Sequence, residues 1–554
     1  MRPKSFAYAV IVMVAAIAAS VAGSVAALAQ SASPQAVGTS SAETPACTEG
    51  TQVETAEGPV CGTVSNGVRT YLGIRYAAPP LGALRWKAPQ PVIPWTDTFE
   101  ATQLPNRCMQ PGANGPARSE DCLTLNVQVP ADAVPGPLPV MFEIHGGGFL
   151  GGTPPDGAHL AKAGRVIVVA TRYRLGILGF FAHAGLGAHS GNYGLQDQQA
   201  ALRWVQRNIA HFGGDPKNVT IFGQSAGGAS VCAQTMSPGA AGLFQRGISE
   251  SGFYNAANGV NNVWEAADCK SRLRSLAQAE QAGAQFAEKV GCGSASDVAA
   301  CMRALPAETL VEQASQTLKP DTGGTIAPTV DGVTLPMSPS EAFAKGRVNK
   351  VSVMIGADHD EINGGVNADA VIATTPEQYR TLVMQRFGSL ARKVLETYPL
   401  ERYPGSSPFI AYRTIVADSD SVCPALAMFD RLSKHMLVYA WEGDDSGMPR
   451  ADFGNSLGAF HDSEARFNLP GANAAPFDPN HLALQQQLNA QWTGFARTGS
   501  PMVAGTPAWT PYTAKNRLVM SMVAGGASAL TPASTIAAQH NCGFWNGTPA
   551  RRAP

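Results

Sequence analysis

Residues 218–229 read Asn-Val-Thr-Ile-Phe-Gly-Gln-Ser-Ala-Gly-Gly-Ala and carry the strongest structural signal in the chain. Residues 219–222 form a short β-branched and aromatic run, typical of a strand buried on both faces. The run leads into Gly223-Gln-Ser-Ala-Gly227, a match to G-x-S-x-G, in which small residues let the chain turn sharply from strand to helix and expose the serine oxygen. Because this pattern also arises by chance in a chain with 58 Gly, its value depends on what flanks it.

The flanking segments alternate between strand and helix patterns. A helix is predicted by Leu195, Leu202, Val205, Ile209 and Phe212, which lie on one face of a 3.6-residue repeat and precede a stop at 213–216. Strands are predicted at 137–144, 165–170, 350–356, 435–441 and 517–520, small edge strands within 62–95, a helical excursion at 256–320 and a helix at 482–498. This order predicts an α/β fold with a large, mostly parallel central sheet covered by helices on both faces.

Composition narrows the class of protein. The 554 residues are 45% hydrophobic and carry a formal net charge of −1, so a large core is expected and no electrostatic argument favours a nucleic-acid or anionic-membrane partner. We see no internal repeat and no linker after residue 46, and we therefore predict a single domain over residues 47–554.

Residues 1–29 have the features of a signal peptide. Two basic residues precede an apolar run over 6–19, and Ala27-Leu28-Ala29 matches an A-x-A cleavage pattern. The alternative, a membrane anchor, is disfavoured because the run is short for a span of about 20 apolar residues and no basic flank follows it. Residues 30–46 form a polar leader that is predicted to be disordered. We expect a secreted or periplasmic protein with no stable membrane anchor.

The order of candidate catalytic residues favours a serine hydrolase. A serine hydroxyl needs a base, and the base needs a third group to orient it. In G-x-S-x-G folds the order along the chain is Ser, acid, His, which places an acid after Gly356 and a histidine later. The histidines that follow Ser225 are His359, His435, His461, His481 and His540. Position favours His461, since the others start a predicted strand or helix, lie in the acid loop or lie near the tail.

The run Gly146-Gly-Gly148 after a predicted strand suggests an oxyanion hole. Consecutive glycines let backbone N–H groups point at one spot, together with the N–H of Ala226, and one such donor is typically worth ~10²–10³ in rate. The alternative is an ordinary glycine-rich turn.

Taken together, these residues resemble the type-B carboxylesterases, the cholinesterase-like branch of the α/β-hydrolases, over roughly 62–545. The matching segments are Gly223-Gln-Ser-Ala-Gly-Gly-Ala-Ser230, Ser119-Glu-Asp-Cys-Leu-Thr-Leu-Asn-Val127, His145-Gly-Gly-Gly-Phe149, Tyr173-Arg-Leu-Gly-Ile-Leu-Gly-Phe180, Gly356-Ala-Asp-His-Asp-Glu361 and Phe460-His-Asp-Ser-Glu464. The resemblance implies an α/β-hydrolase fold with helical excursions over the active site.

The resemblance also assigns the site residues. It implies Glu361 as the acid, with Asp358 and Asp360 as rivals, and His461 as the base. It implies Gly147, Gly148 and Ala226 as oxyanion donors.

The ten cysteines fit an oxidising compartment, and none forms a C-x-x-C pair of the kind found in zinc or thioredoxin-like sites. The resemblance implies disulfides Cys108–Cys122, Cys292–Cys301 and Cys423–Cys542, and Cys47–Cys61 is expected as a local addition. Cys232 and Cys269 have no partner in the family pattern and either pair or stay as buried thiols.

Three residues or segments depart from the family pattern. Gln224 stands where the family usually has Glu, which removes a negative charge beside the triad. Asp462 replaces a Gly after the base and would raise the pKa of the imidazole if it points inward. The 108–122 loop has no aromatic residue to hold a cation, which argues against a specialist for choline esters.

The sequence therefore predicts a serine carboxylesterase that acts on a small-molecule ester through an acyl-enzyme and needs no metal or organic cofactor. The alternatives are an acyl hydrolase for a lactone, an amide or a complex polyester metabolite, and a non-catalytic binding module of the same fold. The sequence sets neither the identity of the ester nor the oligomeric state, because the expected pocket loops, 108–122, 256–346 and 400–420, have no dependable family match.

Overall fold

The computed structural model places the strand predicted at 219–222 in the middle of an 11-stranded sheet. In spatial order the strands are β18 (Ala529–Pro532), β17 (Leu518–Met522), β16 (Val438–Gly443), β15 (Ser352–Asp358), β12 (Arg246–Glu250), β11 (Gly214–Gln224), β9 (Leu138–Ile144), β10 (Ile167–Thr171), β8 (Thr124–Pro130), β4 (Val68–Arg75) and β3 (Thr63–Ser65). Neighbours from β17 to β10 pair in parallel, and antiparallel pairs occur only toward the two edges of this sheet. The predicted mostly parallel α/β sheet is confirmed.

The structure describes residues 46–112, 117–132, 136–252, 273–317, 327–361, 375–447, 458–470 and 477–546. The predicted signal peptide and nearly all of the leader lie outside these ranges. Among the described residues, none of the helices combines the length and the apolar character needed to cross a membrane.

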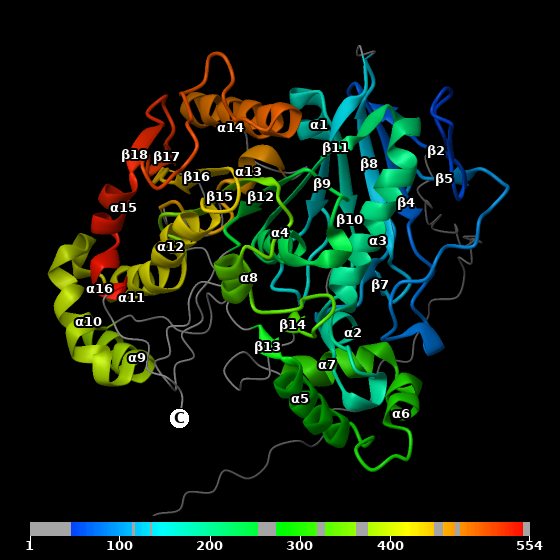
Figure 1. Cartoon of the computed structure of the whole chain (residues 1–554), viewed down its shortest axis with the longest axis horizontal. Helices are drawn as coiled ribbons and strands as arrows, with labels where there is room; N and C mark the ends of the chain where they lie inside the picture. The colour runs from blue at the N-terminus through cyan, green and yellow to red at the C-terminus, as the bar shows by residue number, and fades with distance from the viewer. Residues whose placement is uncertain are drawn as a thin grey trace, which may run out of the picture. The chain divides into compact units, whose positions relative to one another are not determined.

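Helices cover both faces of the sheet (Figure 1). They are α1 (Ala158–Gly164), α2 (Gly176–Phe180), α3 (Tyr193–Asn208), α4 (Ala226–Met236), α5 (Leu276–Lys289), α6 (Val298–Ala304), α7 (Ala307–Thr317), α8 (Pro339–Lys345), α9 (Pro376–Phe387), α10 (Ala391–Thr397), α11 (Pro408–Ala417), α12 (Cys423–Leu432), α13 (Ala465–Asn468), α14 (Pro479–Thr498), α15 (Ala533–Gln539) and α16 (Cys542–Asn546). Smaller sheets pair β1 (Val53–Thr55) with β2 (Gly58–Cys61) and β5 (Phe99–Glu100), β6 (Arg107–Cys108) with β7 (Arg118–Ser119), and β13 (Arg274–Ser275) with β14 (Thr329–Val330).

Successive residues of the central strands enter two different hydrophobic cores. In β9, Phe142 packs in the core that contains residues of α3, α4 and α12, whereas Met141 packs in the core that contains α1 and α14. Side chains of a strand alternate between faces, so a strand buried on both faces must be apolar throughout, as the continuous apolar runs predicted. The strand ends then remain as the places where polar side chains can gather.

Several element boundaries differ from the prediction. The helix predicted at 195–212 is α-helical only to Asn208 and ends in a 3-10 turn, and β16 begins at Val438, so His435 lies outside the strand that it was expected to start. Of the excursion predicted at 256–320, the described part is mostly helical, as α5, α6 and α7 (Figure 1), and it begins with the short strand β13. Strand β12 was missed, because its Arg-Gly-Ile-Ser-Glu sequence offers a single large apolar residue.

The four expected disulfides are present, namely Cys47–Cys61, Cys108–Cys122, Cys292–Cys301 and Cys423–Cys542. Cys232 is also disulfide-bonded, so it is not a buried thiol, while Cys269 lies outside the described residues. Such bonds persist in oxidising compartments.

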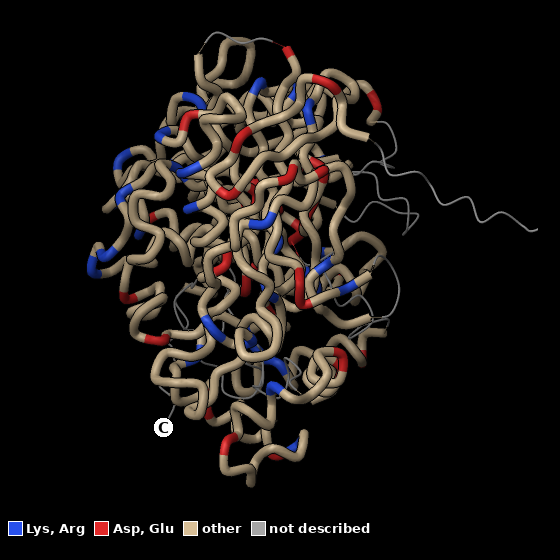
Figure 2. Tube along the Cα trace, turned by 90° about the vertical axis from the view of Figure 1, so that its right-hand side faces the viewer, with Lys and Arg blue, Asp and Glu red and all other residues tan. Residues whose placement is uncertain are grey.

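Charged residues of both signs are interspersed along the described chain (Figure 2). In this view Lys and Arg form no continuous stripe of the kind that tracks a nucleic-acid backbone. This agrees with the near-neutral net charge.

Candidate active site

Ser225 lies at the sharp turn between β11, which ends at Gln224, and α4, which begins at Ala226. Its backbone has φ 58° and ψ −121°, a conformation that residues other than glycine rarely adopt. The surrounding structure holds it there, since the Ser225 amide donates to the Glu250 carbonyl at 2.8 Å. Strain of this kind is typical of a nucleophile elbow.

The glycines of the motif allow this turn because the chain passes very close to β9. A Cβ atom on Gly227 would lie 1.9 Å from the carbonyl oxygen of Ile144. Any side chain at position 227 would therefore push α4 away from the sheet and displace Ser225.

The glycine run after β9 lies beside the turn. A Cβ on Gly146 would be 3.2 Å from the Cβ of Ser225, and Gly147 and Gly148 have φ of 105° and 67°. Among the described residues, none accepts a hydrogen bond from the amides of Gly147, Gly148 or Ala226. These three amides, all close in sequence to Gly146 or Ser225, remain available to a negatively charged oxygen.

His145 fixes the start of this glycine run. Its ring stacks on Tyr173 with 4.5 Å between ring centroids, its Nδ1 donates to the Gly146 carbonyl at 2.9 Å, and the Tyr173 hydroxyl donates to the His145 carbonyl at 2.8 Å. Burial lowers the pKa of His145 to about 4. His145 is therefore neutral at pH 7 and acts as a packing element.

His461 and Glu361 form a hydrogen-bonded pair through Nδ1 and Oε1. Glu361 is fully buried, and its Oε2 accepts from the Asp358 amide at 2.8 Å and from the Ser251 hydroxyl at 3.0 Å. The His461 amide also donates to the Glu361 carbonyl at 3.1 Å. The carboxylate is thus oriented by donors on one oxygen and faces the imidazole with the other.

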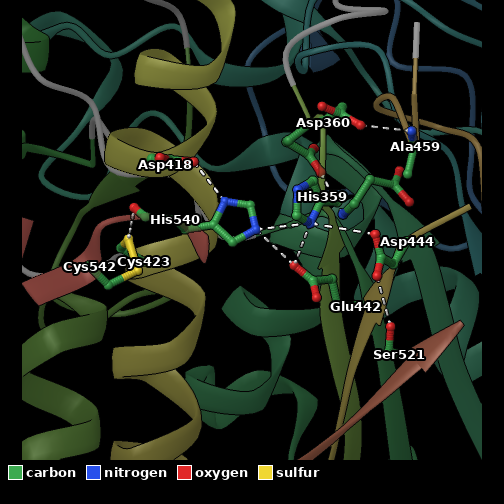
Figure 3. A network of polar contacts seen from close by, with 12 residues as sticks. His359, Asp360, Asp418, Cys423, Glu442, Asp444, Ala459, Ser521, His540 and Cys542 are labelled. Carbon is green, nitrogen blue, oxygen red and sulfur yellow. Dashed lines mark hydrogen bonds and ion pairs between the residues drawn. A yellow bond between two sulfur atoms is a disulfide. The ribbon is translucent and has the colours of Figure 1, made fainter. Parts of the chain in front are cut away.

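The rival acids have other partners. Asp360 Oδ2 accepts from the Ala459 amide at 3.1 Å (Figure 3), and Asp358 Oδ1 accepts from the Ser463 hydroxyl at 3.0 Å. Of the three acids in the 358–361 turn, Glu361 is the one whose carboxylate bonds the His461 ring.

The charge around His461 favours its protonated form. Burial lowers the pKa of the imidazole, but Glu361 above all, then Asp462 and Asp358, outweigh this effect and hold the pKa above 6.5. Asp462 therefore acts on the imidazole in the direction that the sequence suggested. It has φ 82° and forms an ion pair with Arg466 at 3.5 Å.

Gln224 occupies the other face of the imidazole. Its side-chain nitrogen lies 3.0 Å from His461 Nε2. The same nitrogen lies 3.4 Å from Nδ1, so the Gln224 amide contacts the ring between its two nitrogens and does not lie along the lone pair of Nε2. Because Nδ1 carries the proton that faces Glu361, Nε2 is the acceptor nitrogen of the ring. The Ser225 hydroxyl makes no hydrogen bond to a described residue in this arrangement.

Ser225 and His461 line the same pocket, which has a volume of about 300 Å³. Its walls are His145, Gly146, Gly147, Gly152, Thr153, Gln224, Ser225, His461, Asp462 and Arg466. No described residue of the expected pocket loops, 108–122, 256–346 and 400–420, is among them, and parts of the first two loops lie outside the described ranges.

Two residues of the site were not found from the sequence. Ser251 follows β12 with φ 47° and lies 3.0 Å from Glu361 Oε2 and 3.3 Å from Glu464 Oε1. Burial raises the pKa of Glu464 well above its usual range, and the neighbouring Asp358 raises it further. A protonated Glu464 adds no second negative charge beside Glu361. The missed strand β12 concealed Ser251, which otherwise shares the position of Ser225 and Glu361 near the carboxyl end of a parallel strand.

Comparison with known proteins finds matches over nearly the whole described chain. A model of the carboxylesterase family matches residues 49–545. The chain is 35% identical to a cholinesterase of Mus musculus over 475 residues, covering 78% of this chain and 76% of that protein. It is 34% identical to the para-nitrobenzyl esterase of Bacillus subtilis (strain 168) over 487 residues, covering 84% of this chain and 93% of that one.

Solved structures of esterases are also similar to this chain. A thermophilic PNB esterase superposes with a TM-score of 0.72 at 31% sequence identity, over 87% of this chain and 97% of that one. Another PNB esterase structure superposes with a TM-score of 0.73 over 89% of this chain and 99% of that one.

Proposed function

The chain belongs to the carboxylesterase family and is a carboxylic ester hydrolase of the α/β-hydrolase fold, and from this premise we propose that Ser225, His461 and Glu361 are its catalytic triad. The substrate is a small-molecule ester, which is hydrolysed to an acid and an alcohol through an acyl-enzyme.

The reaction runs in two halves. Ser225 Oγ attacks the ester carbonyl while His461 Nε2 takes the hydroxyl proton, and the Glu361 carboxylate stabilises the imidazolium through Nδ1. The amides of Gly147, Gly148 and Ala226 stabilise the oxyanion. His461 then protonates the departing alcohol. Water, activated by the same imidazole, releases the acid from Ser225.

One observation carries this proposal: the His461–Glu361 hydrogen bond lies beside a pocket that Ser225 also lines. The Gln224 amide contacts the ring 3.0 Å from Nε2 and 3.4 Å from Nδ1, so it does not lie along the lone pair that accepts the serine proton. The productive state requires the serine hydroxyl to point along that lone pair.

We further propose that the protein is secreted or periplasmic and that residues 47–554 form a single catalytic domain behind a cleaved leader. The disulfides and the A-x-A pattern at 27–29 support export. The Cys108–Cys122 loop contains no aromatic residue, so we expect simple neutral esters to be hydrolysed faster than choline esters.

A fluorophosphonate probe tests the proposal, because such a reagent phosphonylates a serine only where a base and an oxyanion hole activate it. We expect stoichiometric labelling, mapped by mass spectrometry to the peptide that contains Ser225, and no labelling of Ser225→Ala. Absence of label at Ser225 on the folded wild-type protein would support the alternative of a binding module of the same fold. A panel of esters, lactones and amides of graded acyl length then identifies the substrate class.

A further inference from the structure

A second group of imidazole and carboxylate side chains lies outside the pocket of Ser225. His359, Glu442 and His540 each direct one nitrogen or oxygen atom toward the others, and these atoms lie within 4.8 Å of one another (Figure 3). Within the described part of the chain, no other set of three His, Cys, Asp or Glu residues meets this criterion. The reaction proposed above uses none of the three.

The separations within this group match those of ligands around one metal ion. His540 Nε2 is 3.0 Å from His359 Nδ1 and 3.0 Å from Glu442 Oε1, and His359 Nδ1 is 3.3 Å from Glu442 Oε1. Three atoms at these separations share a point about 2.1 Å from each, which is the usual bond length from Zn²⁺ to an imidazole nitrogen or a carboxylate oxygen.

Hydrogen bonds alone satisfy these three ligand atoms less well than a metal ion would. If His540 is doubly protonated, Nε2–H has a single proton for two acceptors, Glu442 Oε1 and His359 Nδ1, at the same distance of 3.0 Å. A cation at their centre would engage all three lone pairs at once. It would also offset the negative charge of Glu442, which is almost fully buried.

Further carboxylates lie around the three ligand atoms, although no other described carboxylate joins the set within 4.8 Å. Asp444 Oδ1 lies 3.6 Å from His359 Nδ1, and its other oxygen accepts from the Ser521 hydroxyl at 3.1 Å (Figure 3). Asp418 Oδ1 lies 2.6 Å from His540 Nδ1, the nitrogen that faces away from the group. A carboxylate behind a ligating histidine is the usual means of fixing its tautomer and increasing its basicity in metal sites.

The fold holds these residues from four separate segments. His359 follows β15, Glu442 and Asp444 are at the end of β16, and His540 follows α15. Asp418 begins a π-helical turn between α11 and α12, a feature frequent at functional sites. The Cys423–Cys542 disulfide joins the segment of Asp418 to that of His540, so the side chains are positioned before any ligand arrives.

We propose that His359, His540 and Glu442 bind a divalent transition-metal ion, with Zn²⁺ as the ion that two imidazoles and one carboxylate suit best. The ion is structural: it joins the C-terminal segment to the turn that carries Glu361, and no step of ester hydrolysis passes through it. The absence of C-x-x-C pairs, on which the prediction of no zinc site rested, does not bear on a site built from histidine and carboxylate ligands.

The test is direct measurement of metal binding by the full-length protein. Protein stripped with a chelator is dialysed against Zn²⁺ or Co²⁺, and bound metal is measured by mass spectrometry and, for Co²⁺, by its visible absorption. We expect one ion per chain, a higher Tm with Zn²⁺ than without it, and loss of binding in both His359→Asn and Glu442→Gln. Asp418→Asn changes the carboxylate behind His540, which also accepts from the Tyr398 hydroxyl, and should weaken binding about 10- to 100-fold.

His481→Asn is the matched control, because His481 is also nearly buried between two carboxylates, Asp445 and Asp478, but no described histidine completes a ligand set with it. It should keep the full metal content. The proposal is overturned if the stripped wild-type protein takes up no metal, or if the folded His359→Asn and Glu442→Gln variants bind as much as wild type. Neither result depends on the assignment of Ser225, which the fluorophosphonate experiment tests separately.

Discussion

The pocket of Ser225 and the cluster around His540 both combine imidazole and carboxylate groups. They differ in the partners of their histidine rings and in how exposed those rings are. In the pocket, the His461 ring has one nitrogen on the buried Glu361, and the ring contacts Gln224 at the wall of a cavity of about 300 Å³. In the second cluster, both nitrogens of His540 face acceptors, Asp418 on one side and Glu442 with His359 on the other, and the residue is 2% exposed.

This difference assigns a catalytic role to the pocket of Ser225 and a stabilising role to the cluster around His540. An imidazole can transfer a proton only if one nitrogen can exchange partners during the reaction. His461 can do so because its ring lines the pocket that Ser225 also lines, whereas His540 is held on both sides. Variants of the first region should therefore change rates, and variants of the second should change the free energy of unfolding.

The largest effect is expected for Ser225→Ala. Removing the nucleophile should lower kcat for a simple ester by ~10⁶, by analogy with other serine triads, while the fold is retained because the Ser225 side chain makes no hydrogen bond to a described residue. Hydrolysis is measured with a chromogenic ester and stability by thermal unfolding. Near-normal turnover by this variant would show that Ser225 is not the nucleophile, and the pocket would then lose its assigned catalytic role.

Glu361→Gln should have the next largest effect. The amide keeps the shape of the side chain but does not stabilise the imidazolium, so kcat should fall by about 10⁴, as for the corresponding change in other triads. Asp360→Asn is the matched control, since its carboxylate faces the Ala459 amide, and its kcat should fall less than tenfold. The reverse ranking would show that the turn presents Asp360 to His461 during catalysis.

A third expectation concerns stability alone. His540→Gln removes the positive partner, proton or metal, from the buried carboxylates of Asp418 and Glu442, and losing one partner of a buried pair costs about 3–5 kcal/mol. Chemical denaturation measures this cost. His211→Gln, an exposed histidine in the 3-10 turn after α3, should change the free energy of unfolding by no more than about 0.5 kcal/mol. An equally small change for His540→Gln would contradict the structural role of the second cluster.

The two regions also differ in how much of them the sequence could predict. The elbow around Ser225 is formed by consecutive residues, so a single sequence motif predicts both the turn and the nucleophile. Glu361 and His461 follow from chain order and from the family resemblance. The contact of Gln224 with His461 joins residues 237 positions apart, and no local pattern encodes such a contact.

The second cluster was not predictable, because its members share no spacing and come together only when the ends of β15 and β16 meet the C-terminal segment. The sequence offers His359 and His540 only as candidate bases, and their positions disfavour both. Strand β12 was missed for a related reason: it is buried by its neighbours β11 and β15, and not by a continuous apolar sequence of its own.

The smallest effect concerns the pH profile and tests which groups control the pKa of His461. The base must be neutral, so kcat/KM falls as the pH drops through the pKa of His461, which nearby carboxylates raise. Asp462→Asn removes one of these charges and should move the acidic limb to lower pH. Gln224→Glu adds a carboxylate 3.0 Å from Nε2 and should move the limb to higher pH, each by about one unit or less.

Opposite shifts of this limb, measured for the two variants with the same ester and at the same ionic strength, would show that the imidazole is controlled from both faces. A shift in the same direction for both would mean that desolvation, and not the sign of the added or removed charge, dominates at Nε2. Gln224→Leu separates the two effects, since it removes the amide beside the ring without adding charge. If the Gln224 amide has no part in positioning the ring, this variant should hydrolyse esters as fast as wild type. If the amide instead holds the ring in its productive tautomer, kcat should fall.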